Sequence, residues 1–143
     1  APNVAKLTGG LVQTADLTTQ MWKAVPPADW VLCLETAEHI PREHEFMYVR
    51  NLHAHNCRGI VLSWANIEQM GVAHVNTHSR KYLRTLFASL GYVHSANVSR
   101  ALRRAARVNW LKNNLLVFDR ISPICRHSEV GPRAAGTMAP RGT

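Results

Sequence analysis

Apolar residues fall into four short runs that have the length of β-strands. Trp30–Leu34 is apolar on both faces, which is typical of a central parallel strand covered on both sides. Ile60–Trp64 and Leu115–Phe118 are runs of the same kind, and Leu11–Ala15 is a shorter run that ends at an acidic residue, Asp16. We therefore predict strands at these four places.

Helical periodicity appears between the later strands. Pro41–Asn56 begins with a proline, which suits the first turn of a helix. Ser79–Leu90 carries a core-facing apolar stripe, and Asn97–Val108 is amphipathic and basic. Ala65–Asn76 is polar and irregular, which predicts a loop.

This alternation of strands and helices indicates an α/β domain with a mainly parallel sheet. The 143 residues fit one domain. After Ile121 the sequence loses periodicity and fills with Pro, Gly, Arg and Ala. We therefore assign residues 1–120 to the domain and residues 121–143 to a disordered basic tail.

The chain is strongly basic, with 17 Lys and Arg against 9 Asp and Glu and a net charge of +8. This balance suits nucleic acid, an anionic membrane surface or an acidic protein partner. Much of the charge lies on one helix face, where phosphates are one interpretation and a solvated surface is the commoner one. The residues of this face are Arg100, Arg103, Arg104 and Arg107.

Three cysteines, Cys33, Cys57 and Cys125, have no zinc-site spacing, and their odd number argues against a closed disulfide framework. No apolar run approaches the roughly 20 residues that span a bilayer, so we predict no membrane span. We expect an intracellular, cytoplasmic location. An organelle stays open, because a chain that begins at Ala1 rather than methionine is compatible with processing.

Five segments, which occur along the chain in the order expected for the family, together resemble class I S-adenosylmethionine-dependent methyltransferases. Asp29–Pro41, DWVLCLETAEHIP, resembles the fourth strand and following turn of that family, with its D-x-V-x-x-x-E-x-x-E-H-[IV]-P pattern. Leu11–Leu17 and Gly59–Ala65 are similar to the third and fifth strands. Ala73–Asn76, AHVN, resembles a motif in the next loop, and Asn109–Arg120 resembles the final hairpin region.

The resemblance implies a partial Rossmann-like sheet, mainly parallel with an antiparallel last strand, and methyl transfer from S-adenosylmethionine to an unidentified acceptor. The cofactor would lie across the carboxyl ends of the strands. The family's glycine-rich cofactor loop has no counterpart here, since Gly9–Gly10 is a lone pair. We therefore expect the chain to correspond to the C-terminal part of such a domain.

Site residues follow from the same resemblance. Asp16 would accept a hydrogen bond from the adenine amino group, with Leu17 against the ring. Glu35 would face the methyl donor or the acceptor, and Glu38 and His39 would position the acceptor or remove its proton. The acceptor side would be formed by Trp64, His74 and Asn76. The alternative for the Glu35 to His39 segment is a solvated turn that caps a helix. The alternative for Asp16 is a turn residue that ends the strand and binds no cofactor.

No metal site is predicted. His53 and His55 are two residues apart on a predicted helix, so they do not share a face. His74 and His78 are four apart but lie in and beside a predicted loop, with no third ligand at metal spacing.

Without the family's first strands, Trp30–Leu34 would offer an unpaired apolar edge, which favours self-association or a protein partner there. This leaves two alternatives to the enzyme. One is a non-catalytic methyltransferase-like interaction subunit. The other is a basic nucleic-acid-binding module, whose affinity would fall steeply with salt.

Overall fold

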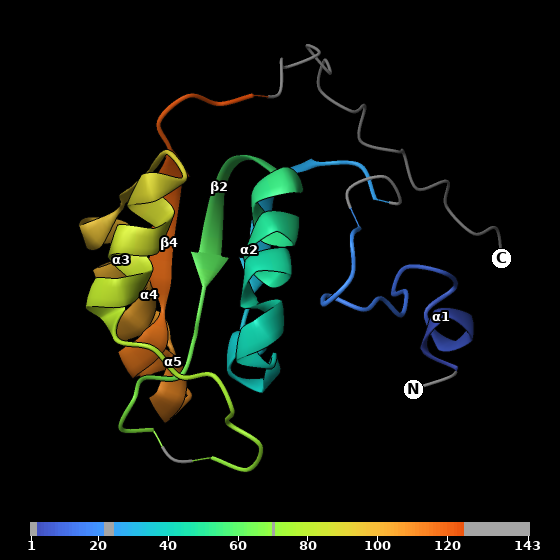
Figure 1. Cartoon of the computed structure of the whole chain (residues 1–143), viewed down its shortest axis with the longest axis horizontal. Coiled ribbons are helices and arrows are strands. Elements are labelled where there is room, and N and C mark those ends of the chain that lie inside the picture. The colour runs from blue at the N-terminus through green and yellow to red at the C-terminus, as the bar shows by residue number, and fades with distance from the viewer. Residues whose placement is uncertain (1–2, 22–24, 70, 125–143) are drawn as a thin grey trace, which may run out of the picture.

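The computed structural model describes residues 3–21, 25–69 and 71–124 (Figure 1). The strands are β1 (Ala28–Cys33), β2 (Asn56–Leu62), β3 (Tyr92–His94) and β4 (Leu116–Arg120). The helices are α1 (Val4–Leu7), α2 (Glu45–Ala54), α3 (Arg80–Ser89), α4 (Ala96–Ala105) and α5 (Asn109–Asn114). Two 3₁₀ turns, η1 (Ala37–His39) and η2 (Arg42–His44), connect β1 to α2.

The four strands form one mixed sheet in the order β1-β2-β4-β3. β1 and β2 are parallel, and β4 is antiparallel to both β2 and β3. β3 therefore runs in the direction of β1 and β2, and only the last strand is reversed. The predicted α/β class, with a mainly parallel sheet and an antiparallel last strand, is confirmed.

One face of the sheet carries the hydrophobic core. Ile60 and Leu62 of β2 lie opposite Phe118 and Leu116 of β4, and all four are buried. In Figure 1, α2 lies in front of β1 and α3 in front of β4, with β2 visible between the two helices. The helices close this core with apolar side chains that recur at helical spacing. These are Tyr48, Val49 and Leu52 of α2 and Leu83 and Phe87 of α3.

The opposite face of β1 is open. Because side chains alternate along a strand, Val31 packs on the core while Trp30 and Leu32 point away from it. Trp30 is 40% exposed and its ring covers Gly59 of β2, whereas Leu32 is 68% exposed. Within the described residues, β1 pairs along one edge only.

Two features of the strand prediction are corrected. Leu11–Ala15 is not a strand, and Leu11 is 90% exposed. The segment follows Gly9 and Gly10, which both have positive φ, and without a neighbouring strand its apolar residues cannot form a ladder. The prediction also missed β3, which is only three residues long and therefore too short to show alternation.

The predicted basic helix is shorter than expected, and a separate helix follows it. α4 ends at Ala105, and α5 occupies part of the segment assigned to the final hairpin. Ser99, which is fully buried, faces the sheet and accepts a hydrogen bond from the amide of Val117 at 2.9 Å. Arg103 is partly buried and donates to the carbonyl oxygen of Leu115 at 2.7 Å. It therefore does not belong to the basic, solvent-facing surface predicted for this helix.

Part of the tail prediction concerns residues 125–143, which lie outside the described residues. Ile121–Ile124 has no helix or strand. No helix among the described residues combines the length and apolar character needed to cross a membrane.

Candidate functional site

Two segments meet at the carboxyl ends of β1 and β2. The carbonyl oxygen of Glu38, in the turn after β1, accepts hydrogen bonds from the amides of Val75 at 2.9 Å and Asn76 at 3.1 Å. Nδ1 of His39 lies 3.1 Å from the carbonyl oxygen of Ala73. The carboxyl ends of adjacent parallel strands share one edge of the sheet, so this edge brings the ETAEHIP turn and the AHVN loop together.

Glu38 is buried at this junction with no compensating partner. Its side chain has an exposed fraction of 0%, and neither carboxylate oxygen has a hydrogen bond. Burial is the main cause that raises the pKa of Glu38, and the neighbouring Glu35 raises it further. A carboxylate in such a position needs either a proton or a cation.

His39 and His74 face each other beside Glu38. Their ring centroids are 5.1 Å apart in an edge-to-face arrangement. Nδ1 of His74 lies 3.1 Å from the carbonyl oxygen of Gln69. A Cβ on Gly71 would collide with the His74 ring, so glycine at this position allows the ring to approach the loop backbone closely.

The backbone is strained on both sides of the junction. Among the described residues, the non-glycine residues with positive φ are Glu35, at 49°, and Ala73, at 59°. The amide of Glu35 donates to Oγ of Ser63 at 2.8 Å, and Oε1 of Glu35 is buried without a partner. Strained backbone of this kind is concentrated at functional sites.

Asn76 connects the loop to a second polar cluster, which the sequence prediction missed. The side-chain amide of Asn76, itself fully buried, donates to Oε2 of Glu45 at 2.9 Å. Nε2 of His78 lies 2.7 Å from the same oxygen, and the hydroxyl of Tyr82 donates to Oε1. Burial raises the pKa of Glu45, but the hydrogen bonds from Tyr82, His78 and Asn76 outweigh it and leave the pKa lowered. Glu45 is thus held ionised.

Trp64 supports the loop from the core. Its side chain is 2% exposed, and its indole Nε1 donates to the carbonyl oxygen of Asn76 at 2.5 Å. Its ring packs edge to face on Tyr48, with centroids 5.7 Å apart. Of the three residues predicted on the acceptor side, Trp64 and Asn76 are buried, and His74 is partly exposed.

Asp16 and Leu17 make their hydrogen bonds within their own segment and with α2. Oδ1 of Asp16 accepts hydrogen bonds from the amide and hydroxyl of Thr18 at 2.9 and 2.7 Å, and these bonds lower the pKa of Asp16. The carbonyl oxygen of Leu17 accepts from Nδ2 of Asn51 at 2.9 Å. In the part of the chain that the structure describes, no hydrogen bond joins either residue to Glu38, His39 or His74.

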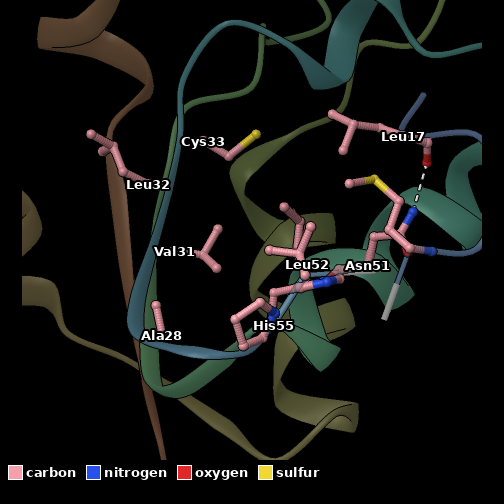
Figure 2. A pocket seen from close by; sticks show the side chains of 11 residues that line it. Leu17, Ala28, Val31, Leu32, Cys33, Asn51, Leu52 and His55 are labelled. Carbon is pink, nitrogen blue, oxygen red and sulfur yellow. Dashed lines mark hydrogen bonds between the residues drawn. The ribbon is translucent and has the colours of Figure 1, made fainter. Parts of the chain in front are cut away.

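Leu17 lines an apolar hollow of about 320 Å³ beside β1 (Figure 2). Val31 and Cys33 enter it from the strand, and Leu52 and His55 from α2 and its end. Figure 2 shows Leu32 on the side of the strand away from Val31 and Cys33. The hollow therefore lies between the strand, the helix and the segment around Leu17.

Comparison with known proteins gives a fold. No family model and no curated protein matches the chain. Among solved structures, magnesium protoporphyrin IX methyltransferase (ChlM) from Synechocystis PCC 6803 with bound SAH is similar, at 17% identity and a TM-score of 0.50. The alignment covers 71% of this chain and 49% of that one. The chain has a class I methyltransferase-like fold.

The same enzyme with bound SAM aligns at 17% identity and a TM-score of 0.48, over 83% of this chain and 51% of that one. The chain thus spans about half the length of the methyltransferase whose fold it shares.

Proposed function

We propose that the chain takes part in S-adenosylmethionine-dependent methyl transfer, as an N-terminally incomplete methyltransferase domain. The observation that carries the proposal is the junction of the Glu38–His39 turn with the Ala73–Asn76 loop. It lies at the carboxyl ends of parallel strands, where open α/β sheets bind ligands. The similar solved structures carry SAH or SAM, which supports the same cofactor here.

The residues present fit one side of this cofactor. Both hydrogen bonds to the Asp16 carboxylate go to Oδ1, which leaves Oδ2 for an exocyclic amine, and Leu17 offers an apolar surface. The buried, unpartnered Oε1 of Glu35 suits a polar group near the methyl donor. When bound, the cofactor supplies a methyl group on a positively charged sulfur. The remaining contacts would come from a glycine-rich loop outside this chain.

The acceptor would be held by the junction. Nδ1 of His39 lies 3.1 Å from the Ala73 carbonyl oxygen, so Nδ1 would carry the proton, and Nε2 of this exposed residue would remove a proton from an acceptor. Glu38 would orient the acceptor, and Trp64, His74 and Asn76 would shape its side of the site. The acceptor's chemical class is left open, because loop residues have no general code for it.

Calorimetric titration with S-adenosylmethionine tests the proposal, after circular dichroism has shown that the chain is folded. Because the glycine-rich loop lies outside this chain, we expect only weak affinity, which should fall about tenfold or more in Asp16→Ala. Asp119→Ala, which alters an exposed carboxylate on β4, serves as the matched control. Equal affinity in both variants would overturn the assignment of Asp16 to adenine.

A second candidate is a non-catalytic interaction subunit, favoured by the exposed Trp30 and Leu32 on a strand that pairs along one described edge. A protein partner or a second copy of the chain would cover this surface. A folded chain without cofactor affinity would favour this candidate. Binding to nucleic acid through Arg100, Arg104 and Arg107 ranks behind it, and would show affinity that falls steeply with salt.

A further inference from the structure

We propose that Glu38, His39 and His74 bind a divalent transition-metal ion. One ligand atom from each residue lies within 4.8 Å of the other two. Metal bonds from imidazole nitrogen and carboxylate oxygen are about 2.0–2.2 Å long, so two ligands of a tetrahedral ion lie about 3.4 Å apart, somewhat closer than the limit seen here. Small side-chain rotations therefore bring these atoms onto a common ion.

The hydrogen-bond partners of the two histidines favour the tautomer that leaves Nε2 free for a metal ion. Nδ1 of His39 lies 3.1 Å from the Ala73 carbonyl oxygen, and Nδ1 of His74 lies 3.1 Å from the Gln69 carbonyl oxygen. A carbonyl oxygen only accepts, so each Nδ1 carries the hydrogen and each Nε2 keeps its lone pair. Metal-bound histidines in proteins are oriented in this way, by a hydrogen bond from the second ring nitrogen.

The carboxylate supplies the second, independent observation. Glu38 is completely buried, and both of its oxygens lack a hydrogen-bond partner. An ionised carboxylate in this state is costly unless a cation compensates it. Oε1 of the neighbouring Glu35 is also buried without a partner, which adds negative potential to the same region. A bound cation would compensate the buried, unpartnered oxygens of both Glu38 and Glu35.

The backbone holds the three ligands in place without a metal. The carbonyl oxygen of Glu38 joins its turn to the loop through Val75 and Asn76, and Gly71 leaves room for the His74 ring. The ligands thus come from two segments that these backbone hydrogen bonds hold together at one edge of the sheet.

The ligand set selects the class of ion. Two imidazoles and one carboxylate suit Zn²⁺, Co²⁺, Mn²⁺ or Fe²⁺, whereas Mg²⁺ and Ca²⁺ prefer oxygen ligands alone. Three protein ligands leave at least one coordination position open. If the proposed methyl transfer holds with metal bound, Nε2 of His39 would be a ligand rather than a base, and the open position would receive a donor atom of the acceptor. Metal binding itself does not depend on that function.

Titration of the folded 143-residue chain with Co²⁺, after tag removal and dialysis against chelator, tests the site. We expect one Co²⁺ per chain, detected by visible absorption and displaced by Zn²⁺. His39→Ala and His74→Ala should each weaken Zn²⁺ affinity at least about tenfold. His44→Ala removes an exposed histidine outside the cluster and should leave the affinity unchanged.

Glu38→Gln separates metal binding from folding. The variant keeps the shape of the side chain but removes its buried charge, so its metal-free melting temperature should be at least that of the wild type. The rise in melting temperature that Zn²⁺ causes in the wild type should be lost. No Co²⁺ binding by the folded wild type, or equal affinity in the wild type and all cluster variants, would overturn the site. No cofactor is present in these titrations, so their outcome is independent of the methyl-transfer proposal.

Discussion

Trp64 donates its indole N–H to the carbonyl oxygen of Asn76 at 2.5 Å, which ties the loop after β2 to the core. Trp64→Phe keeps an aromatic ring against Tyr48 but leaves this carbonyl without its donor. We expect a loss of about 1–3 kcal/mol in the free energy of unfolding, measured by urea denaturation. Exchange of the Val75 and Asn76 amides with solvent should accelerate more than exchange in β4. An equal acceleration in both places would contradict an anchoring role.

A second prediction concerns acid stability. The pKa of Glu45 is lowered, so the stability that Glu45 contributes is complete above the ordinary value of 4.5 and is lost as pH falls through the folded value. Glu45 faces His78 and Tyr82, and the pKa of Tyr82 is raised to about 12 by burial and then by Glu45, so Tyr82 remains a donor at neutral pH. Glu45→Gln should lower the free energy of unfolding at neutral pH.

The same variant should also lose less stability between about pH 5 and pH 3 than the wild type does. Urea denaturation at several pH values measures both effects. Glu43→Gln, on the neighbouring 3₁₀ turn and exposed, is the matched control. If both variants show the same pH profile, the hydrogen-bonded Glu45 does not contribute as described.

Much of the architecture could be predicted from local pattern. β1 and β2 carry continuous apolar runs, and α3 begins after Ser79, whose hydroxyl accepts from the amide of Tyr82. These signals depend on a few consecutive residues. The error at Leu11–Ala15 arises because a strand also needs a neighbour, which local composition does not report. Burial on α4 also depends on tertiary contacts rather than on local composition. The polar Ser99 is fully buried against β4, whereas the apolar Val98 is 48% exposed.

The site was predicted only where a family motif named its residues. The motif assigned roles to Glu38, His39 and His74, and whether those roles hold stays a prediction. These three side chains lie close together because β1 and β2 pair in parallel, and residue spacing along the chain does not predict this pairing. The expectation of no metal rested on histidine pairs close in sequence, whereas this cluster joins residues from two separate segments. Glu45 was missed because a carboxylate in a first helical turn has a sufficient explanation in the helix dipole.

A third prediction concerns Gly59, which lies opposite Trp30 in the β1–β2 pair. A Cβ at this position would collide with the Trp30 ring and with the carbonyl oxygen of Phe118. Gly59→Ala should therefore lower the free energy of unfolding by about 1–3 kcal/mol. In a Trp30→Val background the loss should be smaller but still present, because the Phe118 carbonyl belongs to the backbone of β4. A neutral Gly59→Ala variant would contradict the packing of Trp30 on this glycine.

The last prediction concerns the open side of β1, where Leu32 is 68% exposed. An apolar strand that pairs along one described edge is a template for association with another chain. We expect the isolated chain to self-associate as its concentration rises, as measured by sedimentation velocity. Leu32→Lys should shift the population towards monomer, because a charge on an edge strand opposes further pairing. Leu11→Lys, which alters a 90% exposed leucine outside the sheet, is the matched control and should leave association unchanged. A wild-type chain that stays monomeric at high concentration would argue against a second copy at this edge, and the search would then turn to a different protein that covers it.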